Sequence, residues 1–307
     1  MHEGFELELR FITLRRCLHY STTAMASETC VFGKNESQFI LELIYLYSNA
    51  ARRDFESDIY PLWDTVWNIF ISLFKNVSER PEIILAVAAQ YTLEHRYPNA
   101  RGSTSHHIKI PDNVILKLDD TPQRRLVFWA ELKRLEYPHR WLTADGRAVA
   151  NKAIGKAVPQ VNTQAQYAFA HFNMAQKLNA VIHALIISGP YFVMVEYRAD
   201  RMSPGFFTEN YARRNAAVTR SRNQIYEIEE DPIEDTQTMP FYPFGAIPHC
   251  LFDVTDAELE AGNYELTQEV KLNPMLLQAL RTVLRNHEDI RSGMQRVDWF
   301  DCLTVQT

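Results

Sequence analysis

Two carboxylates and one ammonium group frame a predicted β-hairpin. Asp112 lies near the start of the strand-like run 111–118, and Glu131 and Lys133 end the run 126–133. The β-branched and aromatic residues on either side of a polar break are typical of an antiparallel hairpin. Asp112 and Glu131 are equidistant from the middle of that break, so the hairpin sets them opposite each other. Glu131 and Lys133 share one face because side chains alternate along a strand.

This cluster is suited to metal-assisted hydrolysis of a phosphodiester. Two carboxylates placed close together repel, and a divalent cation between them relieves the repulsion; oxygen ligands favour Mg²⁺ or Mn²⁺. The lysine can hold or activate a water molecule and neutralise charge that develops on a phosphate. The alternative is an exposed hairpin end at which Glu131 and Lys133 form a surface ion pair.

The motif Pro111-Asp112 with Glu131-Leu132-Lys133 resembles that of the PD-(D/E)XK nuclease superfamily, and the chain is similar to uncharacterised fungal members. The resemblance covers about residues 80 to 200. It implies that Asp112 and Glu131 bind Mg²⁺ or Mn²⁺ and that Lys133 serves the attacking water. It also implies an α/β fold with a restriction-endonuclease-like core, α-β-β-β-α-β, around a mixed sheet flanked by helices.

A second Glu-x-Lys motif, Glu269-Val270-Lys271, has Asp253 upstream at a similar spacing. The residues between them, Thr255 to Ala261, have the pattern of a capped helical turn, which interrupts any hairpin. The first motif keeps both of its strands whole. The sequence context therefore favours the site at Asp112.

The neighbouring segments predict the rest of this core. An apolar run from Pro81 to about His95 predicts a buried helix before the cluster. After a polar loop over 134–155, Pro159 opens a helix that runs to about Lys177. Strands 181–187 and 191–197 then form a second hairpin. Together these elements give the α-β-β-β-α-β order.

Four further polar residues are candidate contributors to the site. Family members often carry a glutamate on the first core helix near the metal, which makes Glu82 the first candidate and Glu94 the second. Both can instead be solvated carboxylates at helix ends. Gln160 and Gln164 follow one flank of the later helix, where a corresponding glutamine contacts the phosphate backbone in many relatives.

Five regions follow from the pattern of composition. Amphipathic periodicity predicts helices over 37–53 and 61–75, and Asn273-Pro274 opens a helix from Met275 to about Asn286. The predicted regions are a disordered N-terminal segment (1–34), a helical N-terminal extension (35–80), the nuclease-like core (81–222), a solvated acidic linker (223–240) and a C-terminal extension with a helix (241–307).

Charge is distributed unevenly along a chain whose formal net charge is −6. Residues 223–270 carry 12 acidic residues and no lysine or arginine, so the remainder sums to +6. Residues 124–156 carry eight basic and three acidic residues, and 198–222 carry six basic and two. These basic stretches flank the candidate site and favour a nucleic-acid partner, DNA or RNA undecided. Solvated loops explain the same counts.

Composition also indicates the compartment. No run of 18 or more apolar residues is present, so no membrane span is predicted. The four cysteines, at 17, 30, 250 and 302, have neither metal-ligand spacing nor the pattern of a disulfide framework, which indicates an intracellular setting, nuclear or cytoplasmic. Arginines within the first 25 residues suggest mitochondrial targeting, which Glu3, Glu6 and Glu8 oppose. Nothing indicates an oligomeric state.

Two functions are therefore expected from different classes. The first is a metal-dependent nuclease in which Asp112 and Glu131 bind Mg²⁺ and Lys133 positions water. The second is a non-catalytic module that keeps the fold to bind nucleic acid or protein. The intact Asp, Glu and Lys set favours the enzyme, because clustered carboxylates must be hydrated or paired. A helix over Val114–Leu118 would instead indicate a helical interaction protein.

Overall fold

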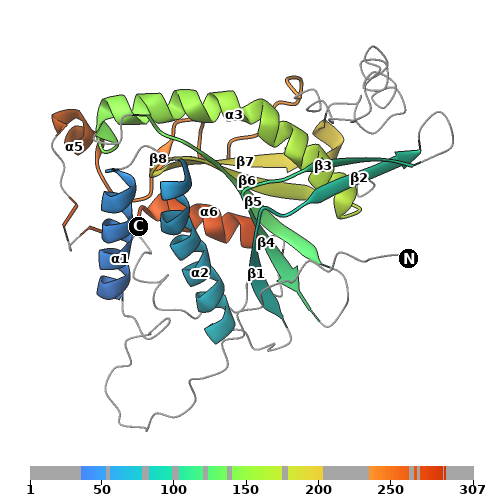
Figure 1. Ribbon diagram of the computed structural model, residues 1–307, viewed down its shortest axis with the longest axis horizontal. Helices are drawn as coiled ribbons and strands as arrows, with labels where there is room; N and C mark the ends of the chain where they lie inside the picture. The colour runs from blue at the N-terminus through green and yellow to red at the C-terminus, as the bar shows by residue number, and fades with distance from the viewer. Residues whose placement is uncertain are drawn as a thin grey trace, which may run out of the picture.

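The protein has an α/β fold, as predicted, built on a mixed six-stranded sheet (Figure 1). The computed structural model describes residues 36–52, 56–77, 83–98, 104–119, 124–136, 140–174, 179–202, 235–262, 266–267, 270–285 and 287. Across the sheet the order is β1 (Ile84–Ala89), β4 (Asn113–Leu118), β5 (Arg125–Lys133), β6 (Val181–Ser188), β7 (Tyr191–Arg198) and β8 (His249–Cys250). All neighbouring strands are antiparallel except β5 and β6.

Helices cover both faces of the sheet (Figure 1). Helix α3 (Ala144–His171) lies over one face, and it makes the long crossover that the parallel pair β5 and β6 requires. On the other face lie α1 (Glu36–Ala50), α2 (Tyr60–Val77) and α6 (Pro274–Leu284). Each layer buries its own hydrophobic cluster against the sheet. No helix within the described residues is long and apolar enough to cross a membrane.

The predicted hairpin is confirmed as the antiparallel pair β4 and β5. Asn113 pairs with Ala130, so the next position aligns Asp112 with Glu131, as the spacing predicted. The register shifts by one residue between Ile115 and Leu116, further from the site. Because 114–118 is a strand, the helical alternative is excluded.

The helix predicted from Pro81 to His95 is wrong. The structure instead has strand β1, a turn, and strand β2 (Leu93–Pro98). Gln90 in that turn has φ 50, a conformation that no helix contains. A short apolar run fits a strand as well as a buried helix, which explains the error. The helix that precedes the sheet is α2.

Strand β2 pairs with β3 (Thr104–Lys109) in a separate two-stranded sheet. In the sequence this pair follows β1 and precedes β4. We call the strand pair β2 and β3 the β-arm. Figure 1 shows the β-arm extending away from the central sheet. At its foot, the backbone N–H of Gln90 donates to the carbonyl of Asp112 at 2.8 Å. The β-arm therefore leads directly into the candidate site.

The prediction for the later helix was right about its existence and wrong about its start. Helix α3 begins at Ala144, where the Thr143 hydroxyl caps it by accepting from the backbone N–H of Gly146 at 3.0 Å. Residues 144–155 were predicted as loop, and Pro159 lies inside the helix. Proline is common at a first helical turn, so it was taken for a start signal. The alanine-rich stretch before it favours helix.

The helices at either end of the described chain were predicted correctly. Helices α1 and α2 match 37–53 and 61–75, and α6 begins after Asn273, whose side chain caps it. The capped turn that separates the second Glu-x-Lys motif from Asp253 is α5 (Asp256–Ala261), with a capping box between Thr255 and Glu258.

Only residues 235–240 of the predicted acidic linker are described. Thr236, Gln237 and Met239 are exposed, but Asp235 and Thr238 are buried, and both contact α3. Residues 203–234 lie outside the described part of the chain, as do residues 1–35.

Candidate functional site

Asp112 is held between the sheet and helix α2. The Tyr60 hydroxyl donates to its Oδ1 at 2.5 Å, and the backbone N–H of Leu132 donates to its Oδ2 at 2.6 Å. The first bond comes from the start of α2 and the second from the neighbouring strand β5. The carboxylate is therefore fixed near the end of β5, which also carries Glu131.

Glu131 is buried, with 3% of its surface exposed, on the face of the sheet that α3 covers. Its Oε1 accepts from Lys133 Nζ at 2.7 Å and from Gln160 Nε2 at 2.5 Å. Its Oε2 accepts from Gln164 Nε2 at 2.6 Å. Three donors thus hold one carboxylate, and two of them come from α3.

The pKa of Glu131 is raised above that of an ordinary glutamate. Burial is the largest cause, and the nearby Asp112 carboxylate raises it further; Lys133 and Gln164 offset part of the shift. A negative charge here is unfavourable both because it is desolvated and because it faces a second carboxylate. A cation placed between the two acids would relieve both costs.

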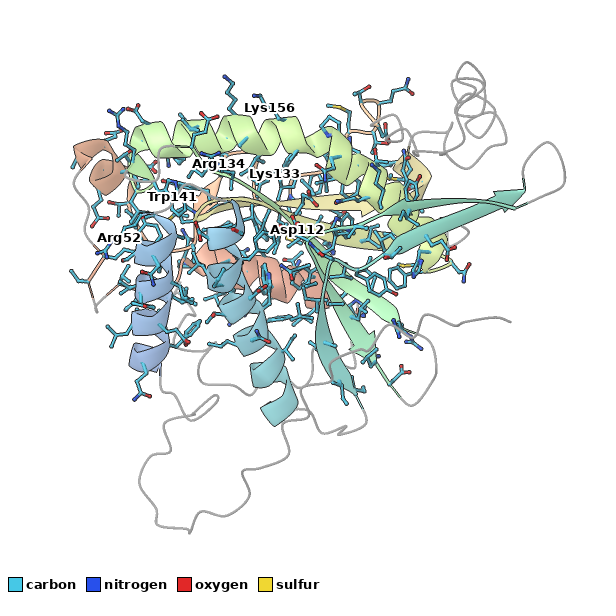
Figure 2. The ribbon with its side chains drawn as sticks, viewed as in Figure 1. Arg52, Asp112, Lys133, Arg134, Trp141 and Lys156 are labelled. Carbon is cyan, nitrogen blue, oxygen red and sulfur yellow. The ribbon has the colours of Figure 1, made fainter. Side chains whose placement is uncertain are left out.

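Lys133 connects this buried acid to solvent. Its side chain is 27% exposed, while that of Glu131 is 4% exposed, and the two form an ion pair at 2.7 Å. The next residue, Arg134, is exposed (Figure 2). An ammonium group therefore lies at the outer, solvent-facing side of the buried carboxylate.

Helix α2 contributes two polar residues that the sequence analysis missed. Tyr60 binds Asp112, and Asp64, one helical turn later, lies near the buried Asn113. Burial raises the pKa of Asp64, and the Asn113 amide lowers it in part. The side-chain amide atoms of Asn113 have no hydrogen-bond partner of normal geometry. No local pattern marks these residues, because the Tyr60–Asp112 contact spans 52 positions.

A spiral row of polar residues runs along α3 toward the site. Lys152, Lys156, Gln160 and Gln164 are spaced four residues apart, the spacing of neighbours on a helix surface. The two lysines are exposed, Gln160 is half-buried and Gln164 is buried. Gln164 also accepts from the Trp129 indole at 3.0 Å, which orients its amide toward Glu131. The two glutamines position Glu131 here.

The other predicted site residues lie elsewhere. Glu82 is outside the described residues. Glu94 lies on β2 rather than on a helix, and its backbone N–H donates to His171 Nδ1 at 3.0 Å, near the C-terminal end of α3. The acidic residue on the helix before the sheet is instead Asp64.

The described residues of the second Glu-x-Lys motif, with the aspartate upstream of it, lack this enclosure. Asp253 and Lys271 are both exposed, and they are joined only through the backbone, where the Asp253 N–H donates to the Lys271 carbonyl at 2.8 Å. Glu269 is outside the described residues. Context separates the two motifs as the sequence predicted.

The donor set is compatible with a magnesium ion. Among the residues that the structure describes, no group of three or more His, Cys, Asp or Glu side chains could hold a metal. Asp112 and Glu131 offer two carboxylates, and Mg²⁺ commonly takes one or two, with water and substrate phosphate completing its shell. Such a pair does not suit structural zinc, which needs four protein ligands.

Comparison with known proteins adds no identification. No protein-family model matches the sequence, and no match to a curated protein was found. Inference about the function of this chain rests on its residues and their geometry.

Proposed function

We propose that the protein is a Mg²⁺-dependent nuclease with a restriction-endonuclease-like fold, in which Asp112 and Glu131 hold the metal and Lys133 positions the attacking water. One observation carries the proposal: the buried carboxylate of Glu131 lies beside a second carboxylate and is paired with a half-exposed lysine. Desolvated acids next to a specific charged partner are typical of functional sites.

The order of the elements supports the proposed fold. Around the site the chain runs through α2, β1, β4, β5, α3 and β6, with the β-arm between β1 and β4. This is the α-β-β-β-α-β order that the resemblance implies, once α2 replaces the helix expected over 81–95. Asp112 precedes β4 and Glu131 lies near the end of β5.

A bound Mg²⁺ would polarise the phosphate and lower the pKa of a water molecule. The residues of the chain orient the two carboxylates, hold the water and offset charge. Tyr60 and the Leu132 N–H orient Asp112, and Gln160 and Gln164 orient Glu131. The Lys133 ammonium holds the water and offsets the negative charge that develops on the phosphate.

Basic residues near the site can receive the phosphate backbone. Lys152 and Lys156 lie on the α3 row that ends at Gln164, and Arg134 follows Lys133. Exposed lysine and arginine provide the sequence-independent part of nucleic-acid affinity. This row gives the substrate a positively charged approach to a site whose own residues include two acids.

The test is cleavage of single- and double-stranded DNA and RNA with Mg²⁺, Mn²⁺ or EDTA. Asp112→Ala and Lys133→Ala should each lower metal-dependent cutting by about 100-fold or more, because each removes a group that acts on the reacting atoms. Asp253→Ala and Lys271→Ala, from the second motif, are matched controls and should cut like wild type.

Circular dichroism and melting temperature must show that all four variants are folded. Equal cutting by wild type, Asp112→Ala and Lys133→Ala would indicate a contaminant and contradict the proposal. Absence of metal-dependent cutting on all four substrates would favour the non-catalytic binding module instead.

A further inference from the structure

The buried Glu131 carboxylate already has donors on both of its oxygen atoms. Its Oε1 accepts from Lys133 Nζ at 2.7 Å and from Gln160 Nε2 at 2.5 Å, and its Oε2 accepts from Gln164 Nε2 at 2.6 Å. An ionised carboxylate offers about four lone-pair sites on its two oxygens, and so about two on each. Both sites of Oε1 are therefore filled, and Oε2 has room for one more partner.

Lys133 is the charged donor of the three. Its ammonium group forms an ion pair with Glu131, whereas the two glutamine amides are neutral. Because Glu131 is buried and faces Asp112, its negative charge requires a compensating positive charge. The ammonium group supplies that charge at the carboxylate to which a metal ion would also bind. Lys133 is thus a counter-ion of the carboxylate pair.

An ammonium group and a metal ion are poorly compatible partners of one carboxylate. Lys133 Nζ lies 2.7 Å from Glu131 Oε1, and Mg²⁺ binds oxygen at about 2.0–2.1 Å. Two cations on this oxygen would lie less than about 5 Å apart, and they would repel each other strongly in a site that excludes most water. A metal ion on Oε2 would draw on the same carboxylate charge and weaken the Lys133 bond.

Lys133 is better able to leave Glu131 than the two glutamines are. Its side chain is 27% exposed, so the ammonium group can move into water on a flexible four-carbon stem. Gln164 is buried, and the Trp129 indole N–H donates to its Oε1 at 3.0 Å. Gln160 lies one helical turn before Gln164 on α3, and its neutral amide does not repel a metal ion.

We propose that the Lys133 ammonium group occupies the cation position at Glu131 in the metal-free protein and gives it up when Mg²⁺ binds. This inference rests on the proposed function, and it adds a form of regulation to the same site. While Lys133 is bonded to Glu131, its ammonium group is not free to hold the attacking water. Metal binding releases it, so the site is assembled in a fixed order, with the metal first and the lysine second.

The first test measures metal binding without nucleic acid. Mn²⁺ replaces Mg²⁺, because its electron paramagnetic resonance signal reports the unbound ion, and Mg²⁺ is then added as a competitor. Lys133→Met keeps an apolar stem and removes the charge. Lys156→Met removes the same charge from an exposed lysine one turn before Gln160, and Gln160→Met removes the neutral donor to the same oxygen (Figure 2 labels both lysines). A pH of about 8 keeps proton competition small.

Lys133→Met should bind Mn²⁺ at least about 10-fold more tightly than wild type, because the bond that it removes is charge-assisted. Lys156→Met should differ from wild type by less than about 2-fold, since water and salt screen an exposed charge. Gln160→Met should bind Mn²⁺ no more tightly than wild type, because it removes no positive charge. A gain in affinity by Lys133→Met cannot result from misfolding.

The second test follows the lysine itself. Because coupling between two ligands of one site is reciprocal, a metal ion that Lys133 weakens must in turn weaken the Lys133 bond. Partial acetylation followed by mass spectrometry should show Lys133 of the wild-type protein modified at least about 3-fold faster with saturating Mg²⁺ than with EDTA. Lys156 should be modified at the same rate in both, which makes it the internal control.

Equal Mn²⁺ affinity of wild type and Lys133→Met would overturn the proposal and leave the metal site of the proposed nuclease in place. An equal gain in Lys156→Met or Gln160→Met would overturn it too, as would unchanged acetylation of Lys133. Absence of metal binding in every protein would overturn both proposals. Tighter binding by Lys133→Met alone, with faster acetylation of Lys133, would support the inference, and would do so even if wild type cuts no nucleic acid and the nuclease proposal fails.

Discussion

Two carboxylates are buried against α3, and their surroundings differ. Glu131 is held by Gln160 and Gln164 on one side of the helix. Asp235 is held on another side, by Gln166 and by the segment that follows it, while its own backbone N–H donates to the Thr163 hydroxyl at 2.8 Å. Both acids are nearly inaccessible to solvent.

Asp235 is surrounded by donors. Its Oδ1 accepts from the backbone N–H groups of Gln237 and Thr238 at 2.8 and 2.9 Å, and its Oδ2 accepts from the Thr238 hydroxyl and from Gln166. Asn162 adds bonds to the carbonyls of Asp235 and Thr238 at 2.9 and 2.8 Å. This network attaches the chain to α3 after residue 234.

The difference lies in the neighbouring charges rather than in burial. Burial raises the pKa of Glu131, the facing Asp112 carboxylate raises it further, and the Lys133 partner reaches solvent. The four hydrogen bonds that the Asp235 carboxylate accepts from Gln166, Gln237 and Thr238 all come from neutral donors. A buried acid satisfied by neutral donors stabilises a fold, whereas one placed beside another acid keeps an electrostatic cost that a ligand can remove. This contrast favours a structural role for Asp235 and supports the proposed role of Glu131 in the reaction.

Replacing Asp235 should have the largest effect on stability. Asp235→Ala leaves several buried donors without an acceptor, which should cost about 3 kcal/mol of unfolding free energy. Urea denaturation measures the loss. Cutting per folded molecule should stay at the wild-type level well below the unfolding midpoint. Lost cutting without lost stability would break the comparison, because Asp235 would then belong to the site.

Magnesium should stabilise the protein in a pH-dependent way. At about 100 times its Kd, a ligand adds roughly 2.7 kcal/mol to the unfolding free energy. Because the pKa of Glu131 is raised, the carboxylate proposed to bind the metal takes up its proton at a higher pH than an ordinary glutamate. The Mg²⁺-induced rise in Tm should therefore be complete above that raised pKa and disappear as the pH falls through it.

Without metal, the contribution of Glu131 to stability depends on pH in the opposite direction. Charged Glu131 disfavours the folded state above its raised pKa, and the penalty disappears as the pH falls through that pKa. Differential scanning fluorimetry with Mg²⁺ or EDTA, between about pH 5 and pH 8, measures both effects. Glu131→Gln should show no Mg²⁺-induced shift. A shift of wild-type size in Glu131→Gln would place the metal elsewhere.

The same substitution at two positions on α3 sharpens the comparison. Gln164→Met removes a donor to Glu131 and should lower cutting about 10- to 100-fold, the usual effect of losing a residue that orients a metal ligand. Gln166→Met removes a donor to Asp235 and should lower Tm with cutting unchanged. Rates at saturating substrate, together with melting curves, test the pair. Equal effects of the two substitutions on cutting would show that the bond from Gln164 to Glu131 has no specific role.

The smallest effect is expected at Tyr60. Tyr60→Phe removes the hydroxyl that donates to Asp112 but leaves the Leu132 N–H in place, so cutting should fall by about 10-fold or less. Tyr91→Phe, which loses its contact with His171, is the matched control and should cut normally. A rise in the Mg²⁺ concentration for half-maximal rate in Tyr60→Phe alone would indicate that Tyr60 positions a metal ligand.

The hairpin could be predicted because its information is local. Strand alternation and equal distances from the break placed Asp112 opposite Glu131, and the structure has that register. The apolar run that contains β1 lacked such information, since its periodicity does not separate strand from buried helix. The start of α3 was missed because Pro159 gave a stronger local signal than the Thr143 cap.

The residues that orient the site could not be found from the sequence, because their partners are distant. Tyr60 reaches Asp112 only once α2 packs beside the sheet. Asp235 belongs to an acidic run, which in composition indicates solvent exposure, yet its Gln166 partner lies 69 positions earlier. Such contacts depend on tertiary packing, and the spacing of residues in the sequence does not predict them.

The register shift between Ile115 and Leu116 has a consequence for engineering the hairpin. On the site side of the shift Ile115 pairs with Phe128, whereas on the turn side Leu116 pairs with Leu126, so the two parts of the hairpin differ in register by one residue. We therefore expect the alignment of Asp112 with Glu131 to be independent of the register at the turn. Residues inserted between Asp119 and Arg124 should leave that alignment intact. Deleting one residue at the shift should slip β4 and turn Asp112 to the opposite face. The hairpin thus offers a position for a reporter peptide that leaves the carboxylates in place.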